Sequence, residues 1–461
     1  MKKRILVISP TPTHPENAGN RIRINVLLKS LKKNGFEIHF LYEDREYDAN
    51  HVYSDNDITG MRKSWDYCYY VFNSSFSLSS IFFNMILKTS TYNKNNRHTL
   101  KYYLLNKLVY YIVRIDYVMS VLLRKVGLII NFFARHISQF LKIYSPSIYH
   151  TITSFRQKYL TNKHASDIDF LNKRTKKYIN ILKNSFSYDY VLAEYIYTSK
   201  TLELFDKKVI KIIDTHDVFS NRNNKYAKWG IKENYMSSSI AEEEKALKRA
   251  DIIIAIQDQE KKYFQKHTDA KVEVIGHKVR LVKPRIRKRS DNNILFVGSI
   301  NTSNVHGITQ FISNIFPEVL KKIPDAKIML VGGICKIIND SPEIIKLGEV
   351  EDLKNTYAEA KVVINPVIIG TGLKIKCVEA IGFSRPLVAT KHALEGLYNQ
   401  KFFNSKKPAF LIANNDKEFS KHIIKLLSNT NYNNSISYNA YNYAIQYNQQ
   451  IDNQVKKVFQ S

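Results

Sequence analysis

The segment from Val362 to Thr390 constrains the fold more than any other part of this sequence. It begins with a short apolar run, Val362–Asn365, which predicts a buried strand. A glycine-containing loop at 370–372 follows, and an amphipathic helix is predicted from Leu373 to Phe383. After a turn, the apolar run Leu387–Thr390 predicts a second strand. Strand, loop, helix and strand in this order predict a βαβ unit of a parallel sheet.

The loop and the first helical turn of this unit suit an anionic ligand. Gly370 and Gly372 let the main chain approach a ligand, and the free N–H groups of a helix N-terminus favour phosphate. Lys374 and Lys376 lie in the predicted first turn, where cations oppose the helix dipole unless an anion is bound. Glu379 follows one turn later. An ordinary βαβ unit with a glycine-rich turn is the alternative explanation.

The stretch GTGLKIKC, followed by Val-Glu-Ala and by Pro-Leu-Val-Ala-Thr, resembles the donor-binding segment of glycosyltransferase family 4, in its bacterial surface-polysaccharide branch. The resemblance implies an α/β protein with two Rossmann-like domains facing a cleft, the GT-B fold, and a retaining transferase. It implies that Glu379 holds the ribose of a nucleotide-diphosphate sugar and that loop amides hold the diphosphate. The donor-binding residues implied are Gly19, Asn20, Ser299, Asn301, Gly370, Thr371, Gly372, Leu373, Lys374, Lys376 and Glu379.

The sequence also departs from that family in three positions. Thr371 stands where many relatives carry a second glutamate for the donor sugar. Ser299 and His306 stand where many relatives carry an arginine and a lysine for the phosphates. We therefore expect Lys374 and Lys376 to supply the cations for the diphosphate, and other loops or main-chain amides to contact the sugar.

The N-terminal part of the chain resembles the first βα unit of the same family. Arg4–Ser9 predicts a strand, because this apolar run is too short for a signal peptide, and a helix is predicted over Arg21–Lys33. The resemblance places Gly19 and Asn20 at the N-terminus of that helix, facing the cleft. Arg21 and Arg23 are candidates for contacts on the acceptor side, with solvated helix positions as the alternative.

The stretch IIDTHDVFSNR is a second resemblance, to the Asp-x-His-Asp that this branch carries after a strand of the N-terminal domain. The carboxyl end of a strand is where an open α/β sheet presents its ligand groups. The resemblance implies that His216 lies near the transferred sugar and acts in catalysis, whereas packing inside the domain is the alternative. Asp217 is predicted to cap the next helix. Glu194, at the end of another predicted strand, is a weaker candidate for acceptor recognition.

The predicted domains are 1–277 (acceptor side, with a helical insertion at about 76–180), a basic linker at 278–291, 292–430 (nucleotide-sugar side), and 431–461 as a helix crossing back. Between residues 61 and 160 the chain has fourteen Lys or Arg and two acids. Aromatic and apolar residues alternate with these cations at helical spacing, which is typical of an interfacial membrane helix. Helices that only cover the sheet are the alternative.

The net charge of +29 needs a partner or a solubilising role. No zinc-finger, RRM or KH pattern occurs, so an anionic membrane surface is expected rather than nucleic acid. The linker cations could meet the membrane or an anionic acceptor, or be solvated. Three cysteines without pairing or metal spacing indicate a reducing compartment. No apolar run approaches the ~18 residues of a membrane span. A cytoplasmic protein, peripheral on the inner face of the membrane, is therefore expected, and its oligomeric state is open.

Two Asp-x-Asp patterns, at Asp55–Asp57 and Asp167–Asp169, have the spacing of a metal-binding motif. The first is predicted in a polar turn and the second in a charged helix, so no metal and no cofactor are expected. The predicted function is metal-independent transfer of a sugar from a nucleotide-diphosphate sugar to a glycan or lipid-linked acceptor in surface polysaccharide synthesis. A sugar-nucleotide 2-epimerase of the same fold and a non-catalytic nucleotide-sugar-binding subunit are the alternatives.

Overall fold

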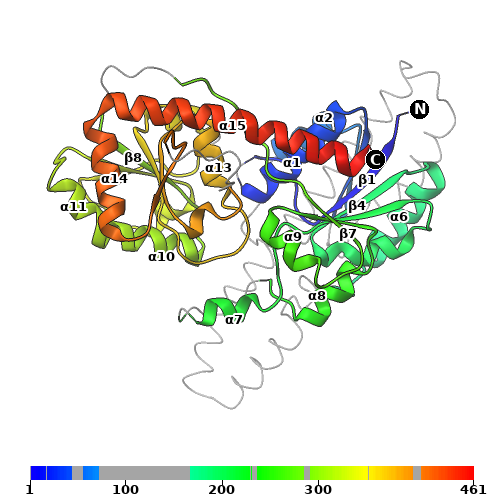
Figure 1. Cartoon of the computed structure of the whole chain (residues 1–461). Helices are drawn as coiled ribbons and strands as arrows, with labels where there is room; N and C mark the ends of the chain where they lie inside the picture. The colour runs from blue at the N-terminus through cyan, green and yellow to red at the C-terminus, as the bar shows by residue number, and fades with distance from the viewer. Residues whose placement is uncertain are drawn as a thin grey trace, which may run out of the picture.

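The computed structural model describes residues 2–16, 18–43, 55–71, 167–228, 230, 236–284, 291–350, 352–397 and 406–460, with residues 55–59 as backbone only. The greater part of the predicted helical insertion, 76–166, lies outside the described residues. So do the linker residues 285–290, with four of its predicted cations. The described residues form two α/β domains connected by one long helix (Figure 1).

The N-terminal domain is built on a seven-stranded parallel sheet with the order β3-β2-β1-β4-β5-β6-β7. Its strands are β1 (Arg4–Ser9), β2 (Glu37–Glu43), β3 (Tyr67–Val71), β4 (Tyr190–Glu194), β5 (Ile210–Asp214), β6 (Ile252–Ala255) and β7 (Lys271–Val274). Its helices are α1 (Gly19–Lys33), α2 (Asp55–Ser64), α6 (Lys173–Ser185), the 3₁₀ segment Ile196–Leu204, α7 (Arg222–Ala227), α8 (Ile240–Leu247) and α9 (Asp258–Phe264).

The C-terminal domain has a six-stranded parallel sheet with the order β10-β9-β8-β11-β12-β13. Its strands are β8 (Asn293–Val297), β9 (Lys327–Val331), β10 (Ile344–Lys346), β11 (Val362–Asn365), β12 (Leu387–Thr390) and β13 (Leu411–Ala413). Its helices are α10 (Thr302–Gln310), α11 (Phe316–Leu320), α12 (Leu353–Glu359), α13 (Ile375–Gly382), α14 (Asp416–Ser428) and α15 (Thr430–Phe459), with short 3₁₀ turns at Gly333–Lys336 and His392–Leu394.

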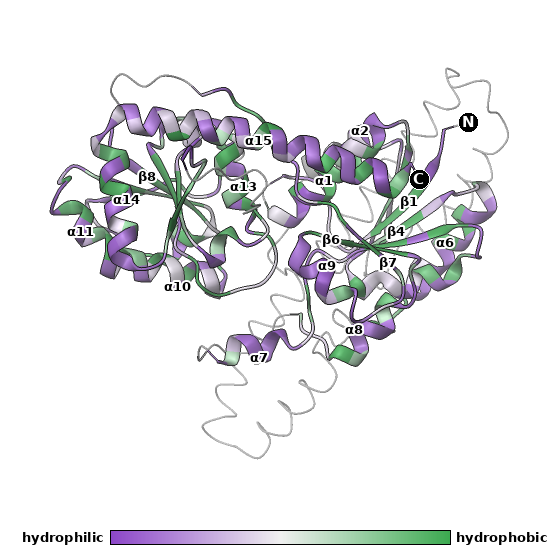
Figure 2. Ribbon diagram, in the orientation of Figure 1, coloured by the Kyte–Doolittle hydropathy of each residue, from purple (hydrophilic) through white to green (hydrophobic). Residues whose placement is uncertain are grey.

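Both sheets are covered by helices on both faces, which explains their composition. In β1 the side chains from Ile5 to Ile8 are all fully buried, and the same holds for most of β11. A strand buried on both faces needs a continuous apolar run rather than an alternating one. The hydropathy colouring shows apolar strands inside each domain and polar residues on the outer surfaces of the helices (Figure 2). The predicted α/β class with two Rossmann-like domains is therefore confirmed.

One helix of the C-terminal domain begins earlier than predicted. Apolar periodicity predicts a helix over about Ile308–Lys322, but α10 begins at Thr302, because the Asn301 side chain accepts a hydrogen bond from the Asn304 N–H. A π-helical turn at Phe311–Ile315 follows before α11. The apolar periodicity begins only where the helix meets the core, so the prediction left out the polar first turns of α10.

The C-terminal segment forms α15, which runs from the C-terminal domain to the N-terminal domain (Figure 1). Near its start, Ile436 packs in the core of the C-terminal domain. At its end, the Phe459 ring packs against the rings of Phe36 and Tyr190 in the N-terminal domain. Lys278 of the linker also pairs with Asp452 of this helix. Among the described residues, no helix combines the length and apolar character needed to cross a bilayer.

Both Asp-x-Asp patterns lie in a different secondary structure from the one predicted. Asp55–Asp57 is the first turn of α2 rather than a loop. Asp167–Asp169 lies in a turn that precedes α6, and Asp169 pairs with Lys245 and Arg249. Helix α6 itself buries Tyr178, Ile179 and Leu182 against the sheet, so the end of the predicted insertion is an integral layer of the N-terminal domain.

Candidate functional site

Each sheet has one point where the direction of strand addition reverses. In the N-terminal domain this point lies between β1 and β4, and in the C-terminal domain between β8 and β11. Loops that leave neighbouring strands in opposite directions open a crevice there, and ligands of open α/β sheets bind in it. The predicted donor residues Ser299 and Gly370 follow β8 and β11, while Gly19 and Glu194 follow or end β1 and β4. The predicted site residues thus gather at both switch points.

The two switch points meet across the domain boundary, where two helices begin. Helix α1 starts at Gly19 and α13 starts at Ile375. A Cβ atom at Gly19 would lie only 3.0 Å from Cδ1 of Ile375, so the two helix starts are in contact. Gly19 therefore lies at the boundary between the two domains. Because helix N-termini carry partial positive charge, two of them facing one space favour an anion there.

The loop between β11 and α13 has a main-chain conformation that depends on its glycines. Gly370 has φ 128° and Gly372 has φ 72°, both disfavoured for residues with a Cβ atom. Lys374 is the N-cap of α13, and its ammonium donates to the carbonyl oxygens of Thr371 and Gly372, each at 3.0 Å. Burial lowers the pKa of Lys374, and the charge of Asp217 opposes this effect. Lys374 therefore stabilises the loop itself.

Lys376 and Glu379 lie behind this loop on α13. The Lys376 ammonium donates to Asn304 Oδ1 and lies 4.4 Å from the centroid of the Phe296 ring. Burial lowers the pKa of Lys376 to about 7 and raises the pKa of Glu379 to about 7. Within the described residues, neither Lys374 nor Lys376 forms an ion pair with an acidic side chain. Positive charge is thus available at this end of α13 for an incoming anion.

The β8 loop is linked to Lys376 through a single asparagine. Asn304 accepts from Lys376 and donates through Nδ2 to the main-chain carbonyl of Ser299 at 3.0 Å. Asn301 uses its Oδ1 to cap α10, accepting from the Asn304 N–H at 2.8 Å. The predicted donor residues Ser299 and Asn301 therefore shape the loop beside the β11 loop, and donor contact by their side chains stays a prediction.

Asp217 does not cap a helix, which corrects the prediction. The N-cap of α7 is Asn221, in a left-handed conformation with φ 52°. Instead, one oxygen of Asp217 accepts from the Val218 N–H at 2.8 Å, and the other accepts from the Thr371 hydroxyl at 2.6 Å. Arg222 Nη1 lies 3.7 Å from the same carboxylate. Asp217 therefore joins the N-terminal domain directly to the glycine loop.

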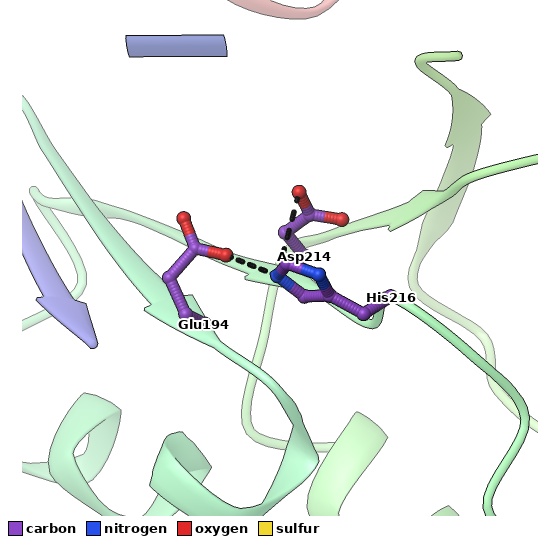
Figure 3. Close-up of side chains that lie close together, drawn as sticks. All are labelled: Glu194, Asp214 and His216. Carbon is purple, nitrogen blue, oxygen red and sulfur yellow. Dashed lines mark hydrogen bonds and ion pairs between the residues drawn. The ribbon is translucent and has the colours of Figure 1, made fainter. Parts of the chain in front are cut away.

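His216 lies beside this connection, two residues after the end of β5, and its ring contacts Glu194 (Figure 3) and Tyr195. Its Nε2 atom lies 2.6 Å from Glu194 Oε2, and one ring face stacks on Tyr195 with 4.0 Å between centroids and 11° between planes. The main chain of His216 has φ 61°, a strained conformation for a residue with a Cβ atom. Strain of this kind persists only where surrounding contacts hold it, as these do.

Two predicted acceptor residues are buried behind His216, which corrects their assignment. Arg23 is 2% exposed and pairs with Asp214 at 2.8 Å, and its guanidinium also donates to the carbonyl oxygens of Ile275 and Gly276. Glu194 is 0% exposed and bonds to His216. Neither side chain can reach an acceptor. Asn20 accepts from the Arg21 N–H at 2.9 Å, and both lie at the start of α1.

Sequence reasoning missed Asp214, although it is the first residue of the Asp-x-His-Asp pattern. Glu194, Asp214 and His216 offer ligand atoms within 4.8 Å of one another and are the one such group among the described residues (Figure 3). Their geometry does not fit an ion. The Nε2 and Oε2 atoms are already at hydrogen-bonding distance, and the charge of Asp214 is already balanced by Arg23.

Two parallel sheets whose switch points face each other define a protein of the GT-B architecture. Residues 291–429 match the family model described as "Glycosyl transferases group 1". An uncharacterised protein in the cps region of Klebsiella pneumoniae is 28% identical over 182 residues, which cover 37% of this chain and 44% of that protein. This chain thus matches less than half the length of that relative.

Solved structures of similar fold cover nearly the whole chain. TarM, in a complex of a variant from S. aureus with Fondaparinux, alpha-GlcNAc-glycerol and UDP, has a TM-score of 0.60 at 12% identity and 100% coverage of both chains. Sucrose-phosphate synthase from Thermosynechococcus elongatus has a TM-score of 0.57 at 12% identity, with 100% of this chain and 98% of that one covered. Anabaena HepE with UDP and glucose has a TM-score of 0.54 at 12% identity and 100% coverage of both. These similarities show the fold, and the family match supports sugar transfer.

Proposed function

We propose that the protein is a retaining glycosyltransferase that moves a sugar from a nucleotide-diphosphate sugar to a glycan or lipid-linked acceptor in surface polysaccharide synthesis. The observation that carries the proposal is the meeting of two helix N-termini, at Gly19 and Ile375, between a lysine-bearing loop and His216. The match to group 1 glycosyl transferases over 291–429 and the relative from a cps region support it.

The C-terminal domain binds the nucleotide in this proposal. The diphosphate lies against the loop 370–372 and the N-terminus of α13, where N–H groups and the helix dipole stabilise negative charge. Lys376 adds a positive charge, and Glu379 accepts hydrogen bonds from the ribose. The same groups stabilise the departing diphosphate as the glycosidic bond breaks, because they are already oriented before charge develops. The proposed reaction uses no metal ion and no cofactor beyond the donor.

The N-terminal domain contributes to the sugar end of the donor. His216 lies beside the transferred sugar, and Asp217 contacts the glycine loop through Thr371. The acceptor hydroxyl attacks from the face that the diphosphate leaves, and a phosphate oxygen takes its proton, so the anomeric configuration is retained. The anomer of the product, read from its NMR coupling constants, tests this part of the proposal.

The acceptor is held near an anionic membrane surface on the cytoplasmic side in this proposal. Its support is the basic composition of residues 61–160, with fourteen Lys or Arg against two acids, and the overall charge of +29. Co-sedimentation with vesicles tests it: binding is expected with vesicles rich in anionic lipid and not with neutral ones, and it should weaken with salt. Equal recovery with both vesicle types would contradict membrane attraction by charge.

A thermal-shift screen across nucleotide sugars, followed by an assay of the bound donor, tests the central proposal. UDP sugars come first, because UDP is present in the similar TarM and HepE structures. A donor at 100 times its dissociation constant adds about 2.7 kcal/mol to the folded state. Sugar release or transfer is then expected. No stabilisation by any nucleotide sugar would overturn the proposal, binding without turnover would favour a non-catalytic subunit, and conversion of the donor to its epimer would favour the epimerase.

A further inference from the structure

Glu194 and His216 form a buried pair that a contact with the acceptor does not explain. Glu194 is the last residue of β4, is 0% exposed, and places Oε2 2.6 Å from His216 Nε2. Its other oxygen, Oε1, is buried without a hydrogen-bond partner in the described part of the chain. Its described partner is therefore the imidazole ring.

We propose that Glu194 is a positioning residue for His216, and that the pair holds two exchangeable protons, so that the ring presents Nδ1 as a hydrogen-bond donor. This inference rests on the proposed function, in which His216 lies beside the transferred sugar. The partner of Nδ1 is then an oxygen of the donor, on the sugar or on the phosphate.

Three contacts determine which edge of the ring is left for a ligand. Glu194 occupies Nε2, Tyr195 covers one ring face at 4.0 Å, and the strained main chain at φ 61° directs the side chain. Nδ1 forms no hydrogen bond with any residue that the structure describes. The atom that meets a ligand is therefore Nδ1.

The charged groups around the pair balance one another. Arg23 of α1 and Asp214 of β5 pair at 2.8 Å, and their side chains are 2% and 0% exposed. Asp214 Oδ2 lies 4.0 Å from Nε2, which is beyond hydrogen-bonding distance. Arg23 attracts the charge of Glu194 and Asp214 repels it, so the pair as a whole supplies no net charge to Glu194.

The remaining neighbours do not supply the missing charge. Asp217 faces Thr371 and Arg222, which lies 3.7 Å away. Glu260, on α9, is itself an acid whose pKa is raised by burial, so it supplies no positive charge. Tyr195 stacks its ring on that of His216. Arg23 is therefore shared by two carboxylates, and His216 or a proton is the remaining source of positive charge for Glu194 among the described residues.

The number of protons that Glu194 and His216 hold together determines whether Nδ1 carries one. A buried net charge is costly, so the pair is either carboxylate with imidazolium or carboxylic acid with neutral imidazole. In the first state both ring nitrogens carry hydrogen. In the second the acid donates to Nε2, and the ring hydrogen is again on Nδ1. Burial also raises the pKa of Glu194, which agrees with a retained proton. Both neutral states therefore present Nδ1–H.

Nitrogen NMR of the full chain, labelled with ¹⁵N-histidine, tests the proton count without any substrate. The His216 signals are assigned by their loss in His216→Gln. At pH 7 the Nδ1 of His216 is expected to carry a proton. In Glu194→Gln the ring has lost the carboxyl that fixes its hydrogen, so the signal of a protonated Nδ1 at pH 7 should weaken.

Glu243→Gln is the matched control, because Glu243 is also a fully buried carboxylate of the same domain but bonds to the Phe219 N–H and Tyr263 instead. It should leave the His216 signals unchanged, and Glu194→Asp should retain the Nδ1 proton. An unprotonated Nδ1 in the wild type at pH 7, or equal Nδ1 signals in the two glutamine variants, would overturn the inference. The wild-type spectrum decides this even if Glu194→Gln does not fold, and a failed transfer assay would count only against the proposed function.

Discussion

The two sides of the candidate site satisfy their charges in different ways. On the N-terminal side, Arg23 pairs with Asp214 and Glu194 bonds to His216, so each charge has its partner within the same domain. On the C-terminal side, Lys374 bonds to loop carbonyls and Lys376 to an amide and a ring, without an acidic partner among the described residues. One side is electrostatically complete before a ligand arrives, and the other is not.

This difference indicates that the two domains have different roles at the candidate site. Groups whose charges are already paired hold a fixed geometry, which is what a residue next to the reacting sugar needs. Groups whose cations lack a counterion gain most when an anion arrives. Affinity for the diphosphate should therefore depend on the C-terminal side, and stability of the fold on the N-terminal side.

The largest expected effect comes from breaking the buried pair on the N-terminal side. Arg23→Met should lower the free energy of unfolding by about 3–5 kcal/mol, because it leaves Asp214 charged and without its partner in the interior. Denaturant titration measures the change. Lys29→Met is the control: Lys29 pairs with Glu16, and the two side chains are 54% and 41% exposed, so the loss should stay below about 1 kcal/mol. Similar losses in both variants would remove the distinction between the two sides.

Removing a cation from the C-terminal side should act on affinity instead. Lys376→Ala should weaken nucleoside-diphosphate binding by about 1.5–3 kcal/mol, the range for a hydrogen bond to a charged group, with little effect on folding. Calorimetric titration with the nucleotide selected by the screen measures it. Lys425→Ala is the matched control, since Lys425 lies 4.1 Å from the Tyr432 ring and away from the loop. Unchanged affinity in Lys376→Ala would show that this lysine does not bind the phosphates.

The contact between the two sides can be measured with a double-mutant cycle. Asp217→Asn, Thr371→Val and their combination remove the 2.6 Å hydrogen bond from one end, the other end or both. A coupling of about 1 kcal/mol in the free energy of unfolding is expected, within the range for directly contacting residues. Strict additivity would mean that the two domains do not hold each other through this bond.

The smallest expected effect is a change of nucleotide affinity with pH, which tests the roles of Lys376 and Glu379 on the C-terminal side. The pKa of Lys376 is lowered to about 7 and that of Glu379 is raised to about 7, both by burial. Below pH 7 Glu379 gains a proton and no longer accepts from ribose, and above pH 7 Lys376 loses its charge. Nucleotide affinity should therefore peak near pH 7.

Two variants separate the acidic limb and the alkaline limb of this pH profile of nucleotide affinity. Lys376→Arg should remove the alkaline limb, because a guanidinium stays charged throughout this range. Glu379→Gln should remove the acidic limb. Dissociation constants measured between about pH 6 and 9 test these predictions. A wild-type nucleotide affinity that does not change with pH would contradict the roles given to Lys376 and Glu379.

Most strands could be predicted because burial on both faces leaves a continuous apolar run. Arg4–Ser9, Val362–Asn365 and Leu387–Thr390 have the bounds predicted for them. The glycine loop before α13 could also be predicted, since few residues other than glycine adopt its conformation. These features depend on residues that are close in sequence.

The partners of the charged site residues could not be predicted, because they depend on distant segments. Arg23 and Asp214 are 191 positions apart, and Asp217 and Thr371 are 154 positions apart. Sequence alone gives Arg23 two equivalent interpretations, solvated or facing a ligand, and the structure shows a third. Only the fold reveals that Asp217 contacts the other domain rather than the helix that follows it.

Helix α15 has a consequence for synthesis of the protein. It is translated after both sheets, yet its side chains complete apolar surfaces in each of them. Until the ribosome has made this segment, the nascent chain displays uncovered hydrophobic area on two domains at once, a state prone to aggregation. Production of the protein should therefore depend on chaperones that bind the nascent chain until α15 has been made.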